Sequence, residues 1–224
     1  MAVDTKDLIL DVAEAMIAER GIDAVSLREI TTAANVNLAA VHYHFGSKEA
    51  LVQQVFERRV KPVNAARLAM LDEAERRWAP GPPELEGILR AFIAPAIRMS
   101  SVTERGALFR RVCGRVFAEP SPSLQAGIDD FFTEIVARFG AAFGRALPGL
   151  EQVELCWRMH FMVGALAHTL MEHDRLQRFT GGLCTMDDPE ALVERLVNFC
   201  AAGMRAGRAA ASEAASGVLQ EASV

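Results

Sequence analysis

Residues 26 to 48, SLREITTAANVNLAAVHYHFGSK, constrain the fold more than any other stretch of this chain. Ser26 is a favourable N-cap, and Glu29, three residues later, completes a capping box, so a helix begins here. Asn35 tolerates the left-handed backbone that often ends a helix, and Asn37 can cap a second helix two residues later. The turn between them is about three residues long, which predicts a helix-turn-helix.

The second helix of this pair, Leu38 to His44, ends at Gly46, and Ser47 caps the helix that follows. Small side chains at Ala39 and Ala40 let its N-terminal end come close to another surface. Its other outward positions carry hydrogen-bonding groups, which suits a helix that enters the major groove of DNA. The residues alone leave a second interpretation open, a surface helical hairpin without a DNA role.

Residues 8 to 51, from LILDVAEAMIAERGIDAVSLREI through TTAANVNLAAVHYHFGSKEAL, resemble the N-terminal DNA-binding domain of the TetR family of transcriptional regulators. The resemblance covers the whole helix-turn-helix. It implies that Arg28 and Asn37 to Ala40 face bases. It also implies that His42 and Tyr43 face bases or the sugar-phosphate backbone.

Two further positions, His44 and Lys48, are implied by the same resemblance to hold phosphates. The chain departs from the family pattern at Leu38, Ala39 and Ala40, where polar residues or glycine are more usual. Alanine cannot hydrogen-bond to a base edge through its side chain, but it can contact a thymine methyl. The DNA-binding candidates are Arg28, Thr31, Asn37, Leu38, Ala39, Ala40, His42, Tyr43, His44 and Lys48.

The charge balance limits how such a protein could bind DNA. The net charge is −5 and the isoelectric point about 5.6, which argues against coating nucleic acid through bulk positive charge. The DNA-binding surface must be local and its non-specific affinity modest, so we expect two copies to bind double-stranded DNA together as a homodimer. Hydrophobic residues make up 51% of the 224 residues, which is ample for a large core.

The expected location is the cytoplasm, without a membrane partner. Asp4, Asp7 and Asp11 interrupt the first helix, and no uncharged run approaches the roughly 20 residues that a membrane span needs. The cysteines lie far apart without CxxC spacing, which predicts reduced thiols, mostly in the core, and no disulfide framework. They are Cys113, Cys156, Cys184 and Cys200.

Helical periodicity continues along the chain without an alternating strand pattern. We predict an all-α fold of about nine helices, with a helix-turn-helix domain at residues 1–50, a ligand-binding and dimerisation bundle at 51–206 and a flexible tail at 207–224. Pro62 should kink or break the helix that contains it. Besides the two motif helices, the predicted helices are Thr5–Arg20, Lys48–Trp78, Leu85–Ser100, Thr103–Ala118, Leu124–Leu147, Leu150–Leu176 and Pro189–Arg205.

The stretch Leu155 to Met171, LCWRMHFMVGALAHTLM, is the most apolar in the chain and must be buried against core, ligand or partner. Arg158 and His160 interrupt it. Arg158 can pair with Glu154 at i,i+4 spacing, and His160 can be a hydrogen-bonded core histidine. Alternatively, either side chain holds an acidic ligand in an apolar pocket.

A metal site is not expected. Cys156 and His160 form one pair at i,i+4 spacing, and His168, Glu172 and His173 lie further along the same predicted helix. Metal sites need three or four ligands that converge on one point, whereas these groups stand roughly 18 Å apart along the helix. No cofactor is indicated.

The resemblance continues beyond the helix-turn-helix. NLAAVHYHFGSKEALVQQVF, ELCWRMHFMVGALAHTL and FCAAGMRA look like the TetR-family branch that senses long-chain fatty acids and controls β-oxidation genes. This implies a repressor that leaves a palindromic operator when a fatty acid or acyl thioester fills an apolar pocket. Another apolar effector, such as a drug or aromatic compound, stays open. The ligand-binding candidates are Phe92, Met99, Phe109, Val112, Phe132, Arg158, Met159, His160 and Met162.

Two other classes of function were weighed against a regulator. Neither G-x-S-x-G, Walker A, H-E-x-x-H nor G-x-G-x-x-G occurs in the sequence, so an enzyme is not expected. A helical lipid-binding protein without DNA function remains the third possibility. For a homodimer, the helix that carries Gly164 and the helix from Leu192 to Met204 offer small residues for close approach, which predicts a four-helix interface.

Overall fold

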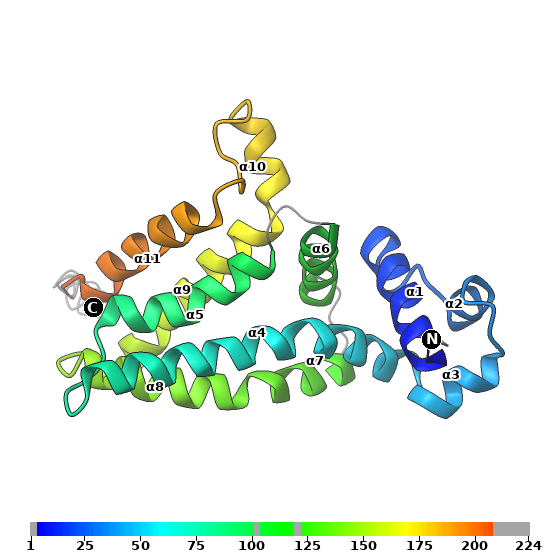
Figure 1. Ribbon diagram of the computed structural model, residues 1–224, viewed down its shortest axis with the longest axis horizontal. Helices are drawn as coiled ribbons and strands as arrows, with labels where there is room; N and C mark the ends of the chain where they lie inside the picture. Colours follow the sequence, from blue (N-terminus) through cyan, green and yellow to red (C-terminus); the bar gives the residue numbers. More distant parts are fainter. Residues whose placement is uncertain (1–3, 101–103, 119–121, 208–224) are drawn as a thin grey trace, which may run out of the picture.

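The computed structural model describes residues 4–100, 104–118 and 122–207. Within these ranges the regular structure is helical and no strand occurs, which confirms the predicted all-α class. Three short helices, α1 to α3, form a head at one end of the long helix α4, and the other helices form a bundle along it (Figure 1). The elements are α1 Thr5–Arg20, α2 Leu27–Ala33, α3 Leu38–Phe45, α4 Lys48–Trp78, α5 Leu85–Met99, α6 Glu104–Ala118, α7 Pro122–Asp129, the 3₁₀ turn η1 Asp130–Phe132, α8 Thr133–Ala146, α9 Gln152–Met171, α10 His173–Phe179 and α11 Pro189–Arg205.

Side-chain caps set the boundaries of the head helices. Ser26 Oγ accepts a hydrogen bond from the Glu29 amide at 3.3 Å, and the Ser26 amide donates to Glu29 Oε2 at 2.8 Å, so the predicted capping box is confirmed. Asn35 has a positive φ of 52°, and the Asn37 side chain accepts from the Ala39 amide at 3.0 Å. The helix-turn-helix therefore forms where the sequence predicts it.

Helix α4 runs without interruption from Lys48 to Trp78 and passes through Pro62. Pro62 therefore does not break this helix, and a kink, the other outcome expected at Pro62, stays a prediction. A proline in a helix interior removes one hydrogen bond and costs about 3 kcal/mol. Val60 and Val63, on either side of Pro62, are buried in the core, and this packing offsets the cost. The head and the bundle consequently share one continuous helix.

Two predicted helices each divide into two. The stretch predicted as Leu124–Leu147 contains the 3₁₀ turn η1 between α7 and α8. Phe131 and Phe132, the last two residues of η1, both lie next to Phe56 of α4, with ring centres 6.2 and 6.3 Å from that of Phe56. The Phe131 carbonyl oxygen also accepts a hydrogen bond from Asn64 Nδ2 at 2.8 Å.

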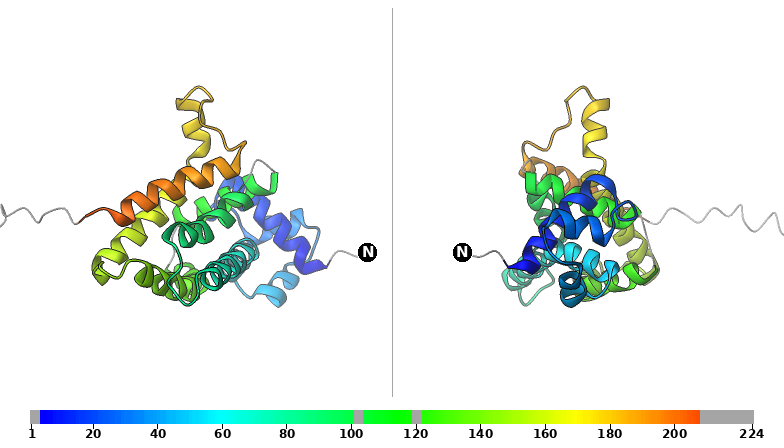
Figure 2. Two further views of the ribbon diagram at one scale, coloured as in Figure 1. Left: turned by 60° about the vertical axis from the view of Figure 1, so that its left-hand side comes forward. Right: turned by 90° about the vertical axis from the view of Figure 1, so that its right-hand side faces the viewer.

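The second division falls at Glu172, between α9 and α10, where φ is −100° and ψ is 11°. His173, the first residue of α10, is buried behind this bend. Figures 1 and 2 show α10 standing out from the bundle in every view. The prediction of a single helix from Leu150 to Leu176 is therefore wrong. The tail predicted at 207–224 lies, beyond Gly207, outside the described residues.

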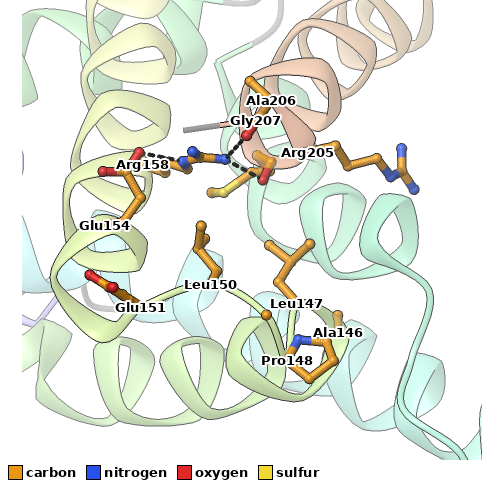
Figure 3. Close-up of a pocket in the computed structure, with 12 residues that line it drawn as sticks. Ala146, Leu147, Pro148, Leu150, Glu151, Glu154, Arg158, Arg205, Ala206 and Gly207 are labelled. Carbon is orange, nitrogen blue, oxygen red and sulfur yellow. Dashed lines mark hydrogen bonds and ion pairs between the residues drawn. The ribbon is translucent and has the colours of Figure 1, made fainter. Parts of the chain in front are cut away.

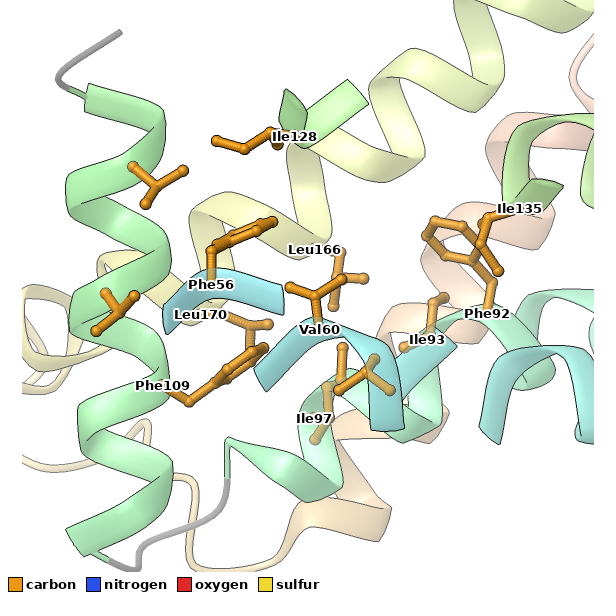
Figure 4. Close-up of a cluster of buried hydrophobic side chains, with 14 of the residues drawn as sticks. Phe56, Val60, Phe92, Ile93, Ile97, Phe109, Ile128, Ile135, Leu166 and Leu170 are labelled. Atoms are coloured by element: carbon orange, nitrogen blue, oxygen red, sulfur yellow. The ribbon is translucent and has the colours of Figure 1, made fainter. Parts of the chain in front are cut away.

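A single hydrophobic cluster extends from the head into the bundle. In the bundle, Phe56 and Val60 of α4 lie among side chains of α5, α6 and α9 (Figure 4). Cys200 is buried and Cys113 half-buried, whereas Cys156 and Cys184 are exposed, which contradicts the expectation that the thiols lie mostly in the core. Within the described ranges, no helix has the length and apolar character to cross a membrane.

Candidate nucleic-acid interface and interior cavity

Helix α3 is anchored by two buried side chains and turns its other positions outward. Val41 is 0% and Phe45 is 7% exposed, so both hold α3 on the head. Tyr43 is 86% exposed, so its large aromatic side chain contributes little to the packing of the head. His42 Nδ1 lies 3.1 Å from the Gly46 carbonyl oxygen and donates to it, so Nε2 is left as an acceptor.

The ten predicted DNA-binding residues differ in their exposure. Thr31 is buried and its hydroxyl donates to the Arg28 carbonyl oxygen at 2.9 Å, so Thr31 has no surface for DNA. Thr32, its exposed neighbour, makes the equivalent bond at 2.8 Å. The remaining nine lie on the surface of the head or at the start of α4. Arg28, Asn37, Ala39, His42 and Tyr43 are exposed, and Leu38, Ala40, His44 and Lys48 are half-buried.

An ion pair that sequence reasoning missed ties α1 to α2. Arg20 Nη2 donates to Glu29 Oε1 at 2.6 Å and to the Ala24 carbonyl oxygen at 2.7 Å. The hydrogen bond from Arg20, followed by those from Ser26, lowers the pKa of Glu29 to about 2. Glu29 therefore closes the capping box and also fixes the loop that precedes α2.

A second missed cluster joins α1 to α4. Glu14, on α1, is 1% exposed, and Oε2 of its carboxylate accepts from Arg58 Nη2 at 2.6 Å and from Arg59 Nη2 at 2.7 Å. Arg59 Nε also donates to Glu14, and Arg58 reaches Asp11 at 2.8 Å. The hydrogen bond from Arg59 to Glu14 raises the pKa of Arg59. The signal in the sequence was an acidic residue on the buried stripe of α1, between Ala13 and Ile17.

A cavity of about 280 Å³ lies in the bundle between α4, α5, α6, α8 and α9, and it opens to the surface beside the exposed Val136 and Val163. Its walls are almost entirely apolar, and several of its side chains are drawn in Figure 4. This volume is near the lower end of the roughly 300 to 1,000 Å³ typical of ligand pockets. The lining residues are Phe56, Val60, Val63, Arg67, Phe92, Ala96, Phe109, Arg110, Cys113, Phe132, Ile135, Val136, Phe139, Met159, Met162, Val163, Leu166, Ala167, Leu170 and Met171.

The cavity contains five of the nine predicted ligand-binding residues, namely Phe92, Phe109, Phe132, Met159 and Met162. The other four do not line it. Val112 is packed in the core at 0% exposure, and Met99 is half-buried at the end of α5.

His160 is exposed on α9, with its ring centre 6.0 Å from that of Trp157 and 6.2 Å from that of Phe161. It is therefore neither a core histidine nor a cavity residue.

Arg158 holds the end of α11 rather than facing the cavity. Its Nε donates to Glu154 at 2.7 Å, which is the predicted i,i+4 pair. Its Nη1 donates to the Ala206 carbonyl oxygen at 2.8 Å (Figure 3). It also donates to the carbonyl oxygens of Met204 at 2.8 Å and Gly203 at 3.2 Å. These bonds satisfy carbonyl groups that a helix C-terminus leaves unpaired.

The cleft around Arg158 is larger, about 430 Å³, but suits a ligand less well than the interior cavity. Glu151 and Glu154 line it beside an arginine whose charge is already balanced. Figure 3 shows Arg158 pointing across it to the end of α11. The smaller, apolar cavity is therefore the better candidate site.

Two arginines of the interior cavity were not predicted. Arg67 is 6% exposed, and its Nε donates to the Phe92 carbonyl oxygen at 2.9 Å. Arg110 donates through Nη1 to the Ser100 carbonyl oxygen. Cys113, near Arg67, has its thiol pKa raised to about 12 because burial disfavours the thiolate. A charged residue at helical spacing from Val60 and Val63 was the available signal for Arg67.

Large apolar side chains are also exposed on α9 and α11. Trp157 is 56%, Phe161 63% and Phe199 69% exposed. Gly164 and Gly203 have nothing within 4 Å of the place where a side chain would start. The two helices that the sequence assigns to an interface thus carry an uncovered apolar surface.

A helix-turn-helix head joined by one continuous helix to a bundle with an apolar cavity defines the class of protein. Residues 9–55 match the family model described as bacterial regulatory proteins, tetR family, and residues 90–203 match the one described as tetracyclin repressor-like, C-terminal domain. The chain belongs to the TetR family. This is a family of regulatory proteins, not of enzymes.

Individual relatives are more distant. The HTH-type transcriptional regulator AcrR of Shigella flexneri is 27% identical over 111 residues, which is 50% of this chain and 48% of AcrR. The match thus spans about half the length of that relative. Among solved structures, the fold is similar to FadR from Bacillus subtilis in complex with stearoyl-CoA, with a TM-score of 0.65, 14% identity and coverage of 88% of this chain and 98% of that one. NalD, the secondary repressor of the MexAB-OprM multidrug efflux pump in Pseudomonas aeruginosa, has a TM-score of 0.62, 21% identity and coverage of 87% and 94%.

Proposed function

We propose that this chain is a ligand-controlled transcriptional repressor, a homodimer that leaves a near-palindromic operator when a fatty acid or an acyl thioester fills the cavity. One observation carries the proposal. Helix α4 starts directly after α3, packs on α1 through Arg58 and Arg59, and lines the cavity with Phe56 and Val60. Any change in the cavity that moves α4 therefore acts on the head.

The head is the proposed DNA-binding domain, at residues 1–50, and 51–206 form the effector-binding and dimerisation domain. The outward residues of α3, Tyr43 and His42 among them, have no partner in the core, and major-groove recognition gives their exposure a purpose. With a net charge of −5, one head makes too few phosphate contacts for strong binding. Two heads on one duplex supply the rest.

The proposed dimer interface is the apolar surface on α9 and α11. Apolar side chains gathered on adjacent helices mark interaction surfaces, and Trp157, Phe161 and Phe199 are gathered there. A two-fold axis through this surface makes a four-helix interface and places two equivalent heads on one face of DNA, with half-sites about 34 to 36 Å apart. A monomer in light scattering at micromolar concentration would contradict this arrangement.

The walls of the cavity and one similar structure support the proposed effector class. They are almost entirely apolar, and the fold is shared with a FadR that was crystallised with stearoyl-CoA. A second candidate effector is an aromatic compound, because Phe56, Phe92, Phe109, Phe132 and Phe139 all line the cavity and could stack on it.

The proposal is tested by selecting operator DNA from a pool of random duplexes with the purified protein. An enriched inverted repeat, bound less tightly as salt rises, is the expected result. Dodecanoic acid, its coenzyme A thioester and a planar aromatic acid are then added to the complex. If no DNA sequence is enriched, the DNA-binding role is contradicted. If the protein–DNA complex stays intact with all three compounds, effector control by fatty acids, acyl thioesters and aromatic acids is contradicted.

Two substitutions test how the head recognises DNA. Arg28→Ala should cost about 1 to 3 kcal/mol and relax the preference at one base pair of each half-site, because Arg28 is exposed and suited to a guanine edge. Lys48→Ala should weaken binding to all DNA sequences by the same factor and make the affinity fall less steeply with salt concentration. If Arg28→Ala also lost the same DNA-binding affinity for every sequence, base recognition by Arg28 would be contradicted.

A further inference from the structure

The charge of Arg67 is balanced by neutral oxygen atoms only. Its Nε donates to the Phe92 carbonyl oxygen at 2.9 Å and its Nη1 to Asn64 Oδ1 at 3.0 Å. Its guanidinium carbon lies 4.2 Å from the centre of the Phe92 ring. A guanidinium has five N–H donors, and these two bonds engage one at Nε and one at Nη1. Hydrogen-bonding capacity therefore remains on a side chain that is 6% exposed and lines the cavity.

The missing partner is an anion. Among the described residues, no Asp or Glu lines the cavity, and Arg67 forms no ion pair. Burial lowers the pKa of Arg67 to about 10, so the side chain is still charged at neutral pH. A buried charge without a counterion is costly, and an incoming anion removes that cost. A carboxylate matches the planar fork of a guanidinium better than any neutral group does.

Arg67 also has a defined place along the cavity. Helix α4 lines it with Phe56, Val60, Val63 and Arg67 in turn. Phe56 and Arg67 stand about 16 Å apart along the helix axis. The part of the cavity wall formed by α4 is therefore apolar from Phe56 to Val63. The positive charge of Arg67 lies at its end, on the side away from the head.

We propose that Arg67 binds the carboxylate of a free, slender carboxylic acid whose hydrocarbon tail lies along α4 toward Phe56 and Phe109. This inference rests on the effector control proposed above and makes its ligand more specific. The cavity selects the free acid over its thioesters, esters and alcohols. The tail then ends beside the part of α4 that holds the head through Arg58 and Arg59.

A thioester fits this arrangement poorly. It replaces the carboxylate by a neutral carbonyl group, which leaves the Arg67 charge unbalanced. The nucleotide headgroup of a coenzyme A thioester also exceeds a cavity of about 280 Å³ and would have to remain outside it. Arg158 cannot take the carboxylate instead, because Glu154 and three carbonyl oxygens already occupy it outside the cavity.

The first experiment uses the unaltered protein. Dodecanoic acid, dodecanol, methyl dodecanoate and dodecanoyl coenzyme A are titrated by calorimetry, and each is also added to the protein–operator complex. We expect the acid to bind about 10 to 100-fold more tightly than the alcohol or the ester, since a hydrogen bond to a charged group is lost in both. Equal binding of acid and alcohol, or tighter binding of the thioester, would overturn the role of Arg67.

The second experiment changes the receptor. Arg67→Met should abolish the preference for acid over alcohol while keeping alcohol affinity, and Arg67→Lys should retain part of it. Arg110→Met is the matched control, because Arg110 also lines the cavity and donates to a neutral carbonyl oxygen but is less deeply buried than Arg67. An acid preference that survives Arg67→Met, or that Arg110→Met removes instead, would overturn the assignment.

The two proposals fail in different ways. If alcohol, ester and acid all release the operator equally well, effector control stands and the carboxylate site is wrong. If the acid binds with the expected preference but never changes operator affinity, the carboxylate site stands and effector control is wrong. If no compound binds, both are overturned. The unaltered protein alone gives these outcomes, even if Arg67→Met does not fold.

Discussion

On helix α4, the pair Arg58 and Arg59 differs from Arg67 in what balances the charge. Arg58 and Arg59 meet the carboxylate of Glu14, which is 1% exposed. Arg67, about two turns further along, is 6% exposed and meets only the Phe92 carbonyl and the Asn64 amide oxygen. The chain thus completes the first group itself and leaves the second for a ligand.

The difference assigns a separate task to each part of the helix. Removing one partner of a buried ion pair is strongly destabilising, whereas a buried charge without a counterion is already a cost in the free protein. The Glu14 cluster fixes the head to α4, and Arg67 provides a charge that becomes balanced only when an anion enters. Predictions that separate the two groups follow, from the largest effect to the smallest.

Glu14→Ala should lower the free energy of unfolding by about 3 kcal/mol, measured by urea denaturation. The expected value is at the low end for a buried pair, because the side chains of Arg58 and Arg59 are 27% and 19% exposed and water screens them. Asp11→Ala is the control, since Asp11 pairs with the same Arg58 but is 64% exposed. It should cost less than about 1 kcal/mol. Equal losses in the two variants would contradict a special role for Glu14.

Glu14→Gln should uncouple the cavity from the head. In the unaltered protein we expect the effector to weaken operator binding roughly 5 to 150-fold, a coupling of about 1 to 3 kcal/mol. The glutamine side chain has the shape of Glu14 but not its charge, so its contact with Arg58 and Arg59 is weaker. Movement of α4 should then displace α1 less. Fluorescence anisotropy on labelled operator, with and without dodecanoic acid, measures this. Full release in Glu14→Gln would show that α1 receives the movement by another route.

Arg67→Met should change the unfolding free energy of the ligand-free protein by no more than about 1 kcal/mol. The lost bonds to Phe92 and Asn64 destabilise it, and removal of an unbalanced buried charge stabilises it by a similar amount. Dodecanoic acid should raise the melting temperature of the unaltered protein, and it should raise that of this variant by less, no more than dodecanol does. If Arg67→Met lowered the free energy of unfolding as much as Glu14→Ala does, Arg67 would stabilise the fold as Arg58 and Arg59 do, which would contradict its role as a site for an anion.

The smallest expected effect on stability comes from the ion pair of Arg20 and Glu29. This pair is exposed, unlike the cluster around Glu14. The folded pKa of Glu29 is about 2, below its ordinary 4.5, so its contribution to stability is present above pH 4.5 and is lost as the pH falls through about 2. Backbone amide signals at the start of α2, followed by NMR between these pH values, should report this loss. Glu29→Gln should remove the dependence, and its persistence there would point to another titrating group.

Features set by neighbouring residues could be predicted from the sequence. Ser26, Glu29, Asn35 and Asn37 define the helix-turn-helix because caps and turns depend on side chains only a few positions apart. Apolar periodicity also found the main helices. It did not find the 3₁₀ turn at Phe131 and Phe132, whose rings lie next to Phe56, a residue far away in the sequence.

The polar groups of the cavity were harder to predict. Arg158 and Arg67 both interrupt apolar stripes, and only the packing of other helices decides that Arg158 holds α11 while Arg67 lines the cavity. Likewise, His160 lies in the most apolar stretch of the chain, yet α9 turns that face outward. Phe92 and Phe109 do line the cavity, because large apolar residues on facing helices meet at an interior in most arrangements.

The most direct test of effector control is a reciprocal titration with dodecanoic acid and operator DNA. Affinity for the acid is measured by calorimetry in the presence and absence of saturating operator, and affinity for the operator is measured in the presence and absence of saturating acid. Because coupling between two sites is reciprocal, both affinities should fall by the same factor, roughly 5 to 150-fold. An acid affinity that operator DNA leaves unchanged would contradict control of the head through the cavity.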